Sequence, residues 1–331
     1  MATDILITEN IGGRWIDELK KKFAVTLDPD LWKSPDKIKA MLPNCRALIV
    51  RNQTRVNADL ISAGPLLQVV GRAGAGLDNV DLKVATAAGV VVVSTPDQNS
   101  ISVAELTLGM MLMLARKLAA ANQHAHTGGW ERQRFVGTEL YGKNFGVVGI
   151  GRIGFLTALR ARALGMNILA HDTYVSPDAV AVAETHATLL SLDELLAQSD
   201  FVSCHVPLTP ETKHFFNYDR FCRMKSSAFF LNLARGEVVD ENGLVRALQE
   251  KRIAGAALDV REQEPPPAGN PLAGMENVIL TPHIAAFTRE AQDRVVAAVC
   301  QDVAAVLEGR AARNFANFPQ PKRSSPISKG S

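Results

Sequence analysis

Short runs of β-branched and apolar residues alternate with longer amphipathic stretches along most of the chain. Such runs are typical of strands buried on both faces of a parallel sheet, and the stretches between them are typical of helices. Regular alternation of the two predicts an α/β protein with parallel sheets and right-handed crossovers. The strands predicted in the first part of the chain are 4–8, 23–27, 47–50, 67–71 and 90–93.

The pattern changes near Asn99 and then begins again. Residues 100–122 are predicted to form one long helix that connects two domains. A final helix is predicted at about 288–308, and the pattern alone leaves open whether it belongs to the first or the second domain. The strands predicted in the second series are 145–150, 167–172, 200–206, 227–234, 255–260 and 278–280.

Length and charge narrow the class of protein. A chain of 331 residues is long enough for two domains. The 36 basic and 34 acidic residues give a net charge of +2, which predicts no nucleic-acid partner and no membrane partner. The first ten residues lack the basic start of a signal peptide, and the apolar stretch 106–115 is too short to span a bilayer. The four cysteines lack metal-binding spacing, so we expect a cytoplasmic protein with reduced thiols.

A glycine-rich turn follows one of the predicted strands. Gly149, Gly151 and Gly154 form a GxGxxG motif between an apolar strand and a helical pattern. In dinucleotide-binding folds these glycines permit a tight turn, close approach of the backbone to pyrophosphate, and close packing of helix on strand. The helix that begins there points its N–H groups at the phosphates. The motif in this context predicts a dinucleotide site.

An acidic residue lies where such a site needs one. Asp172 ends the next predicted strand, 172 − 149 = 23 residues after the first glycine. A carboxylate there accepts hydrogen bonds from ribose hydroxyls and repels a 2′-phosphate, which favours NAD over NADP. The alternative is a glycine turn in an unrelated α/β protein, with Asp172 capping a loop at the surface.

Three polar residues follow three strands of the second series. Arg235, Glu264 and His283 can meet, because ligands bind at the carboxyl ends of strands in open α/β sheets. Arginine can hold a carboxylate through two hydrogen bonds, histidine can exchange a proton near neutral pH, and glutamate can orient the imidazole. This combination suits hydride transfer to or from a hydroxy acid. Alternatively, Arg235 caps a helix or pairs with Glu237, Glu264 is solvated, and His283 is structural.

With these segments in view, the chain resembles the D-isomer-specific 2-hydroxyacid dehydrogenase family. Within that family it is most similar to the 3-phosphoglycerate dehydrogenase branch, in a short form without the regulatory C-terminal domain. The resemblance covers about residues 4–315. The motifs that carry it are VGRAGAGLDNVDL (70–82), NSISVAEL (99–106), GTELYGKNFGVVGIGRIG (137–154), HVPLTPET (205–212), NLARGEVVDENGLVRAL (232–248), AGAALDVREQEPP (254–266) and LTPHIAAFTREAQ (280–292).

The resemblance implies two Rossmann-like or flavodoxin-like parallel-sheet domains and a homodimer. It implies a discontinuous substrate domain, 1–98 and 288–318, around an NAD-binding domain, 99–287. Residues 319–331 are rich in proline, serine and glycine, which predicts a frayed tail. His283 is then the acid/base, Arg235 binds substrate, and Glu264 supports the histidine. The implied NAD contacts are Ala75, Gly149, Gly151, Arg152, Ile153, Gly154, Asp172, Val206, Pro207, Leu233, Ala234 and Asp259. The implied substrate contacts are Arg51, Arg72, Gly74, Ala75 and Arg235.

The choice of 2-hydroxy acid is left open. The resemblance favours 3-phosphoglycerate, with sulfolactate, glyoxylate, hydroxypyruvate and a branched 2-oxo acid as alternatives. Arg132 and Arg134 either reach a partner's cleft or are ordinary surface arginines. Ala285 and Phe287 depart from the usual glycine and small polar residue, and an aromatic ring there predicts a narrower or more apolar pocket.

Two other classes of protein are alternatives to a D-2-hydroxyacid dehydrogenase. An NAD-responsive binding protein, like the C-terminal-binding co-repressors, keeps the same catalytic residues, but this chain lacks their long disordered flanks. An L-specific malate or lactate dehydrogenase fits poorly, because those enzymes have their glycine motif near the N-terminus and here it starts at Gly149.

Overall fold

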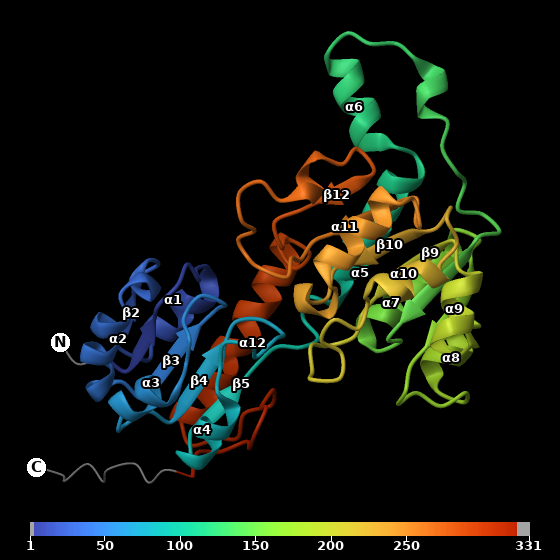
Figure 1. Ribbon diagram of the computed structural model, residues 1–331. Helices are drawn as coiled ribbons and strands as arrows, with labels where there is room; N and C mark the ends of the chain where they lie inside the picture. The colour runs from blue at the N-terminus through green and yellow to red at the C-terminus, as the bar shows by residue number, and fades with distance from the viewer. Residues whose placement is uncertain (1–2, 323–331) are drawn as a thin grey trace, which may run out of the picture. The chain divides into compact units, whose positions relative to one another are not determined.

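The computed structural model describes residues 3–322 and divides the chain into two compact units. The first unit contains the chain up to Asn99 and again from Thr288, and the second spans Ser100–Phe287. Figure 1 follows the chain from blue through green and yellow to red. Among the described residues, none of the helices combines the length and the hydropathy that a membrane crossing requires.

The first unit is built on a five-stranded parallel sheet. The strand order is β2-β1-β3-β4-β5, the flavodoxin-like order, so the chain steps outward from β1 to one edge and then to the other. These strands are short runs of β-branched and apolar residues, and most of them are buried on both faces. Their bounds are β1 Ile5–Ile7, β2 Val25–Leu27, β3 Ala47–Val50, β4 Val69–Arg72 and β5 Val91–Val93.

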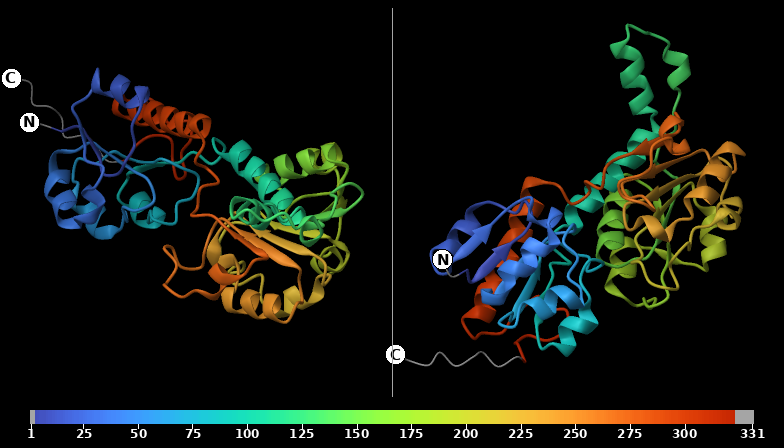
Figure 2. Two further views of the ribbon diagram at one scale, coloured as in Figure 1. Left: turned by 90° about the horizontal axis from the view of Figure 1, so that it is seen from above. Right: turned by 60° about the vertical axis from the view of Figure 1, so that its left-hand side comes forward.

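Alternate side chains of this sheet face two helical layers. Ile5, Ile7 and Ile49 point into a cluster with α1 (Arg14–Lys20) and α12 (Arg289–Leu307). Leu6 and Leu48 point the other way, toward α2, α3 and α4. The last helix, α12, therefore packs on the first unit, and Figure 2 shows it beside the blue strands. The second layer consists of α2 Pro35–Met41, α3 Ala58–Ala63 and α4 Leu82–Ala87, with 3₁₀ turns η1 Leu31–Lys33 and η2 Leu42–Asn44.

The second unit is built on a seven-stranded parallel sheet in the order β12-β11-β10-β9-β6-β7-β8. Its first strand, β6, lies inside the sheet with β7 on one side and β9 on the other. The order of the strands reverses at β6, and ligands bind beyond the carboxyl ends of strands at such a reversal. The bounds are β6 Asn144–Val148, β7 Asn167–His171, β8 Thr188–Leu189, β9 Phe201–Cys204, β10 Phe229–Asn232, β11 Gly255–Leu258 and β12 Val278–Leu280.

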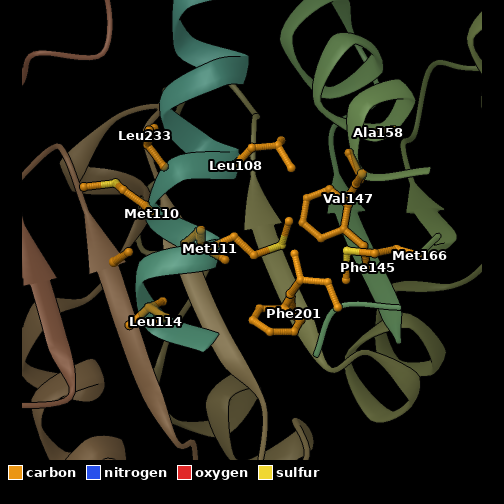
Figure 3. Close-up of a cluster of buried hydrophobic side chains, with 14 of the residues drawn as sticks. Leu108, Met110, Met111, Leu114, Phe145, Val147, Ala158, Met166, Phe201 and Leu233 are labelled. Carbon is orange, nitrogen blue, oxygen red and sulfur yellow. The ribbon is translucent and has the colours of Figure 1, made fainter. Parts of the chain in front are cut away.

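One face of the seven-stranded sheet is covered by α5 and α7, and the other by α9, α10 and α11. Figure 3 shows Met111 of α5 among Phe145, Val147 and Phe201 of the strands. The helices are α5 Ser100–Ala115, α6 Leu118–His126, α7 Arg152–Ala163, α8 Val180–Thr185, α9 Leu192–Gln198, α10 Tyr218–Arg223 and α11 Glu241–Gln249, with 3₁₀ turns η3 Arg132–Phe135, η4 Gly236–Val238 and η5 Pro271–Gly274.

The predicted single helix at 100–122 is wrong, because the chain breaks between α5 and α6. Lys117 adopts a left-handed conformation with φ of 51°. The carbonyl of Ala115 accepts a hydrogen bond from the N–H of Thr138 at 2.8 Å. The segment at Thr138 therefore takes the hydrogen bond to the Ala115 carbonyl that the next turn of a continuous helix would have made. In Figures 1 and 2, α6 and the segment after it project away from the sheet of the second unit.

The tail predicted to fray from residue 319 is hydrogen-bonded in its described part. The carbonyl of Pro319 accepts from the N–H of Ala312 at 2.8 Å, and the N–H of Lys322 donates to the carbonyl of Gly89 at 3.0 Å. Phe318 is buried in the core of the first unit and anchors the segment. The prediction for 323–331 lies outside the described residues.

Gly71 lets α12 lie close to β4, and we expect Gly71→Ala to destabilise the protein. A Cβ there would lie 2.7 Å from Val299 Cγ1 and 2.9 Å from Val303 Cγ2, so these side chains or the helix that carries them must shift. Overpacking of this kind costs about 1–3 kcal/mol. Chemical denaturation would measure the loss. Gly12→Ala is the matched control in the same unit, because a Cβ at Gly12 meets nothing within 4 Å. Equal stability of the two variants would contradict the prediction.

Candidate functional site

The glycine-rich turn lies directly after β6. Gly149 has φ of 91°, and a Cβ there would lie 3.0 Å from the backbone of His205. A Cβ at Gly154 would lie 2.1 Å from the carbonyl oxygen of Gly149. At Gly151, by contrast, a Cβ would meet nothing within 4 Å. The protein's own packing therefore requires the first and third glycines, while the second faces open space.

The open side of the turn has the features of a pyrophosphate site. Gly151 is the N-cap residue of α7, a helix of 12 residues, and it has no side chain to cap the helix. Arg152 and Ile153, two of the predicted cofactor contacts, form the first turn of α7. A helix N-terminus beside an open glycine face suits a phosphate group, because N–H groups and the helix dipole both favour an anion. The residues present fit a dinucleotide.

Asp172 is tied to the same turn. It follows β7, and its Oδ2 accepts a hydrogen bond from the N–H of Ile150 at 3.0 Å. Its Oδ1 accepts from the N–H of Tyr174 at 2.9 Å. These bonds hold the carboxylate beside the glycine turn. A carboxylate offers about four acceptor positions, so capacity for ribose hydroxyls remains.

Four more of the predicted cofactor residues follow β9, the neighbour of β6, and β10, the next strand along the sheet. Val206 and Pro207 come after β9, with His205 between, and Leu233 and Ala234 come directly after β10. Leu233 is 5% exposed and packs in the hydrophobic core, so it offers backbone rather than side chain to a ligand. The buried Asn232 holds this turn: its Oδ1 accepts from the N–H of Ala234 at 3.0 Å, and its Nδ2 donates to the carbonyl of Arg235 at 2.8 Å.

His283 and Glu264 are hydrogen-bonded to each other. His283 Nδ1 lies 2.7 Å from Glu264 Oε2, and Glu264 Oε1 accepts from the N–H of Arg261 at 3.0 Å. Burial raises the pKa of Glu264, but hydrogen bonds from His283 and Arg261 and the charge of Arg235 outweigh it, so the pKa is lowered. Glu264 is therefore ionised at neutral pH and accepts from Nδ1–H, and the bond does not use Nε2, the other ring nitrogen of His283.

Arg235 lies in a turn that packs against the segment carrying Glu264. A Cβ at Gly236 would lie 1.8 Å from the carbonyl oxygen of Arg261, so the two backbones touch. Arg235 Nη1 donates to the carbonyl of Ala234 at 2.7 Å. The structure thus brings the ends of β10, β11 and β12 together. Arg235, Glu264 and His283 come from those three ends.

Asp259, predicted as a cofactor contact, holds the turn that carries His283. Asp259 is 1% exposed, and its carboxylate accepts hydrogen bonds from Thr281 Oγ1 at 2.5 Å and from the N–H groups of Ile284 and Ala285, both at 2.8 Å. Its backbone carbonyl accepts from the N–H of His283 at 2.7 Å. His283 has φ of 54°, a conformation that L residues rarely adopt. The Asp259 carboxylate therefore keeps the histidine in an unusual backbone position.

In the first unit, the predicted substrate residues follow two adjacent strands. Arg51 follows β3, and Arg72 ends β4, with Gly74 and Ala75 just beyond it. Arg51 Nη2 is hydrogen-bonded to Gln292 Oε1 of α12. The Arg72 guanidinium lies against Gly74, where a Cβ would be 1.7 Å from Nη1. Two arginines at adjacent strand ends form a cationic edge that suits an anionic ligand.

Arg132 and Arg134 lie in η3, beyond α6. Arg134 pairs with Glu276 at 3.2 Å and lies over the ring of Phe135. Of the two residues that depart from the family pattern, Ala285 is buried and Phe287 is 58% exposed.

Sequence reasoning missed a buried ion pair beneath Glu264. Arg261 Nε and Nη2 donate to the two carboxylate oxygens of Glu241 at 2.9 and 3.0 Å. Burial raises the pKa of Glu241, but the hydrogen bonds and the charge of Arg261 outweigh burial, so the pKa is lowered and the carboxylate stays ionised. The partners are twenty residues apart and share no motif. The available signal was an arginine almost directly after a fully buried strand, where a charge needs a partner.

A family model matches residues 108–285: D-isomer specific 2-hydroxyacid dehydrogenase, NAD binding domain. D-3-phosphoglycerate dehydrogenase of Archaeoglobus fulgidus is 41% identical over 315 residues, which is 95% of this chain. The chain spans about three fifths of that relative's length, 59%.

Two solved structures share the fold over almost the whole chain. D-lactate dehydrogenase from Aquifex aeolicus, complexed with NAD and lactic acid, has a TM-score of 0.85 and 29% identity and covers 96% of this chain and 99% of its own. An NADPH-dependent glyoxylate/hydroxypyruvate reductase from Sinorhizobium meliloti, with NADP and malonate, has a TM-score of 0.86 and 28% identity and covers 98% and 100%.

The lowered pKa of Glu264 predicts how the variant Glu264→Gln responds to pH. A carboxylate whose pKa is lower in the folded state stabilises the fold above its unfolded pKa, and that contribution is lost as pH falls through the folded value. We therefore expect wild type to be more stable than Glu264→Gln at neutral pH. The difference should shrink as the pH falls below about 4.3, the ordinary value for glutamate. Urea unfolding at several pH values would measure it, and a pH-independent difference would contradict the assignment.

Proposed function

The chain belongs to the D-isomer-specific 2-hydroxyacid dehydrogenase family, and on that premise we propose that it interconverts a D-2-hydroxy acid and its 2-oxo acid with NAD. The observation that carries the proposal is the hydrogen bond between His283 Nδ1 and Glu264 Oε2. The segment that carries Glu264 packs against the turn that contains Arg235. An acid/base, its orienting carboxylate and a carboxylate-binding cation are the groups that this reaction requires.

Each of the three side chains has a distinct task. Glu264 fixes the tautomer of His283, so that Nε2 takes the hydroxyl proton in oxidation and returns it in reduction. Arg235 binds the substrate carboxylate through its guanidinium and stabilises negative charge that develops on the oxygen at C2. NAD, when bound, accepts or supplies the hydride. Asp259 holds His283 in place through the backbone of its turn.

NAD is proposed in preference to NADP because of Asp172. Its carboxylate is held beside the glycine turn by two backbone N–H groups. A fixed negative charge there repels a 2′-phosphate and accepts from the ribose hydroxyls of NAD. The fold alone does not decide the coenzyme, since the Sinorhizobium meliloti reductase is NADPH-dependent.

The proposed substrate is 3-phosphoglycerate, or a 2-hydroxy acid with a second anionic group. Arg51 and Arg72 supply cations beyond the one that holds the carboxylate, and the Archaeoglobus fulgidus relative is a D-3-phosphoglycerate dehydrogenase. Sulfolactate carries a similar second anion, whereas glyoxylate, hydroxypyruvate and branched 2-oxo acids lack one. Those three substrates would give Arg51 and Arg72 no second anionic group to bind.

A cytoplasmic homodimer completes the proposal. Trp130 is 84% and Tyr141 79% exposed, and Ile101, Leu112 and Leu118 add further apolar surface along α5 and α6. Large exposed apolar surfaces mark interfaces. In a dimer formed there, Arg132 and Arg134 of η3 would approach the partner. The mass of a single chain in light scattering would contradict the dimer.

We expect His283→Gln to abolish turnover while leaving NADH binding intact, because glutamine keeps a hydrogen bond to Glu264 but cannot exchange a proton. Steady-state assays and a fluorescence titration with NADH would measure the two effects. His214→Gln is the matched control, since His214 Nε2 also lies 2.7 Å from a glutamate, Glu262 Oε1, with the same 43% side-chain exposure as His283. Unchanged turnover in His283→Gln would refute the assignment.

The substrate prediction is tested by NADH and NADPH consumption with phosphohydroxypyruvate, sulfopyruvate, hydroxypyruvate, glyoxylate and an apolar 2-oxo acid. We expect phosphohydroxypyruvate with NADH to give the highest kcat/KM, because Arg51 and Arg72 bind the distal anion. Preference for a 2-oxo acid with an uncharged side chain would overturn the prediction of a phosphorylated substrate, but the proposed reaction class would remain.

A further inference from the structure

The loop after β3 has a carboxylate at its centre. The N–H groups of the four consecutive residues 51–54 all donate to the side chain of Glu9, which follows β1. Glu9 Oε1 accepts from Arg51 at 2.8 Å and from Thr54 at 3.0 Å. Glu9 Oε2 accepts from Asn52 at 3.1 Å and from Gln53 at 3.0 Å. The four N–H groups enclose a single anion supplied by the chain itself.

The arrangement explains how a charge is tolerated inside the first unit. Glu9 is 3% exposed, and an isolated carboxylate in that setting is strongly unfavourable. Convergent backbone N–H groups form anion-binding nests, and hydrogen bonds to an ionised acceptor are about twice as strong as neutral ones. Without Glu9, four N–H groups of one loop would lose their acceptor together.

Other side chains bind the carbonyl groups and a hydroxyl group of the same loop. Asn79 Nδ2 donates to the carbonyls of Arg51 at 3.1 Å and Thr54 at 2.7 Å. The hydroxyls of Thr8 and Thr54 are hydrogen-bonded at 2.7 Å. The loop lies outside the helices and strands, between the end of β3 and the start of α3. Its conformation therefore depends on these side chains, with Glu9 making the most bonds.

Arg51 takes its position from this loop. Its backbone N–H is one of the four that Glu9 binds, and its guanidinium reaches Gln292 on α12. Burial lowers the pKa of the Arg51 guanidinium, and the negative charge of Glu9 offsets part of that effect. Glu9 thus fixes where the Arg51 backbone lies, and its negative charge lies near the cationic side chain.

We propose that Glu9 is a positioning residue for anionic substrates: it fills the N–H nest of residues 51–54 and thereby holds Arg51 where the distal anion of the substrate binds. The inference rests on the proposed function, in which Arg51 contacts that anion. Because Glu9 already occupies the nest, a substrate phosphate is left to the Arg51 side chain. Loss of Glu9 then affects substrates with a second anionic group and spares those without one.

The test compares Glu9→Ala with wild type on phosphohydroxypyruvate and on glyoxylate. We expect the KM for phosphohydroxypyruvate to rise about tenfold or more in Glu9→Ala, with kcat and the KM for glyoxylate changed by less than about twofold. Formate, a small carboxylate that fits the space left by the deleted side chain, should lower the raised KM and raise the Tm of the variant. It should not change the Tm of wild type.

Asp302→Ala is the matched control. Asp302 is a buried carboxylate of the same unit, and it accepts from the N–H groups of Arg313 at 2.7 Å and Asn314 at 3.1 Å. It has no contact with Arg51 in the described residues. We expect its loss to lower the Tm without any difference between the two substrates. If Glu9→Ala fails to fold, Glu9→Gln, which keeps one acceptor oxygen, should give the same selective rise in KM without formate rescue.

The outcomes separate the inference from the proposed function. If wild type shows no preference for phosphohydroxypyruvate, or if Arg51→Ala affects both substrates equally, the substrate part of the proposed function fails, and the role of Glu9 fails with it. If Arg51→Ala is selective but Glu9→Ala behaves like Asp302→Ala, the inference alone is overturned. A selective rise in KM that formate reverses supports it.

Discussion

Loops beyond the carboxyl ends of the strands are held by carboxylates that bind their backbone N–H groups. In parallel sheets the functional residues lie in these loops, where no ladder or helix satisfies the backbone. Glu9 binds residues 51–54, Asp172 binds Ile150, and Asp259 binds Ile284 and Ala285. Each bond joins one strand end to another. These bonds make the loops at the carboxyl ends of the strands rigid, so the side chains that the loops carry keep fixed positions.

Close contacts between these loops also explain why glycine occupies three positions in them. Gly149 and Gly154 bring two backbones into contact, and Gly236 brings its turn against Arg261. Such contacts leave no space for a Cβ, so the loops can adjust little. Rigidity of this kind suits the proposed reaction, in which a proton and a hydride must be transferred at defined atoms. The Glu241–Arg261 pair holds the segment whose N–H groups include the one that binds Glu264, the carboxylate partner of the histidine.

The local pattern predicted the fold class, because parallel strands buried on both faces leave continuous apolar runs such as 47–50 and 278–280. The glycine motif and Asp172 were also found locally, and the structure brings them together. It hydrogen-bonds Glu264 to His283 as well, and their catalytic role stays a prediction. What sequence reasoning missed depends on distant partners. The break at Lys117 depends on Thr138, and Glu9 and Arg261 bind partners twenty or more residues away. No spacing rule connects such residues.

The return of α12 to the first unit has a consequence for how the chain matures on the ribosome. Chains emerge from the N-terminus and domains generally fold as units. Strands β1 to β5 are synthesised before the whole of Ser100–Phe287, yet the apolar layer that covers Ile49 and Val69 includes Val299 and Val303 of α12. The sheet of the first unit must therefore wait with one face uncovered until α12 is made. During that interval the nascent chain presents a surface that chaperones recognise, and the second unit, encoded without interruption, can be complete before the first.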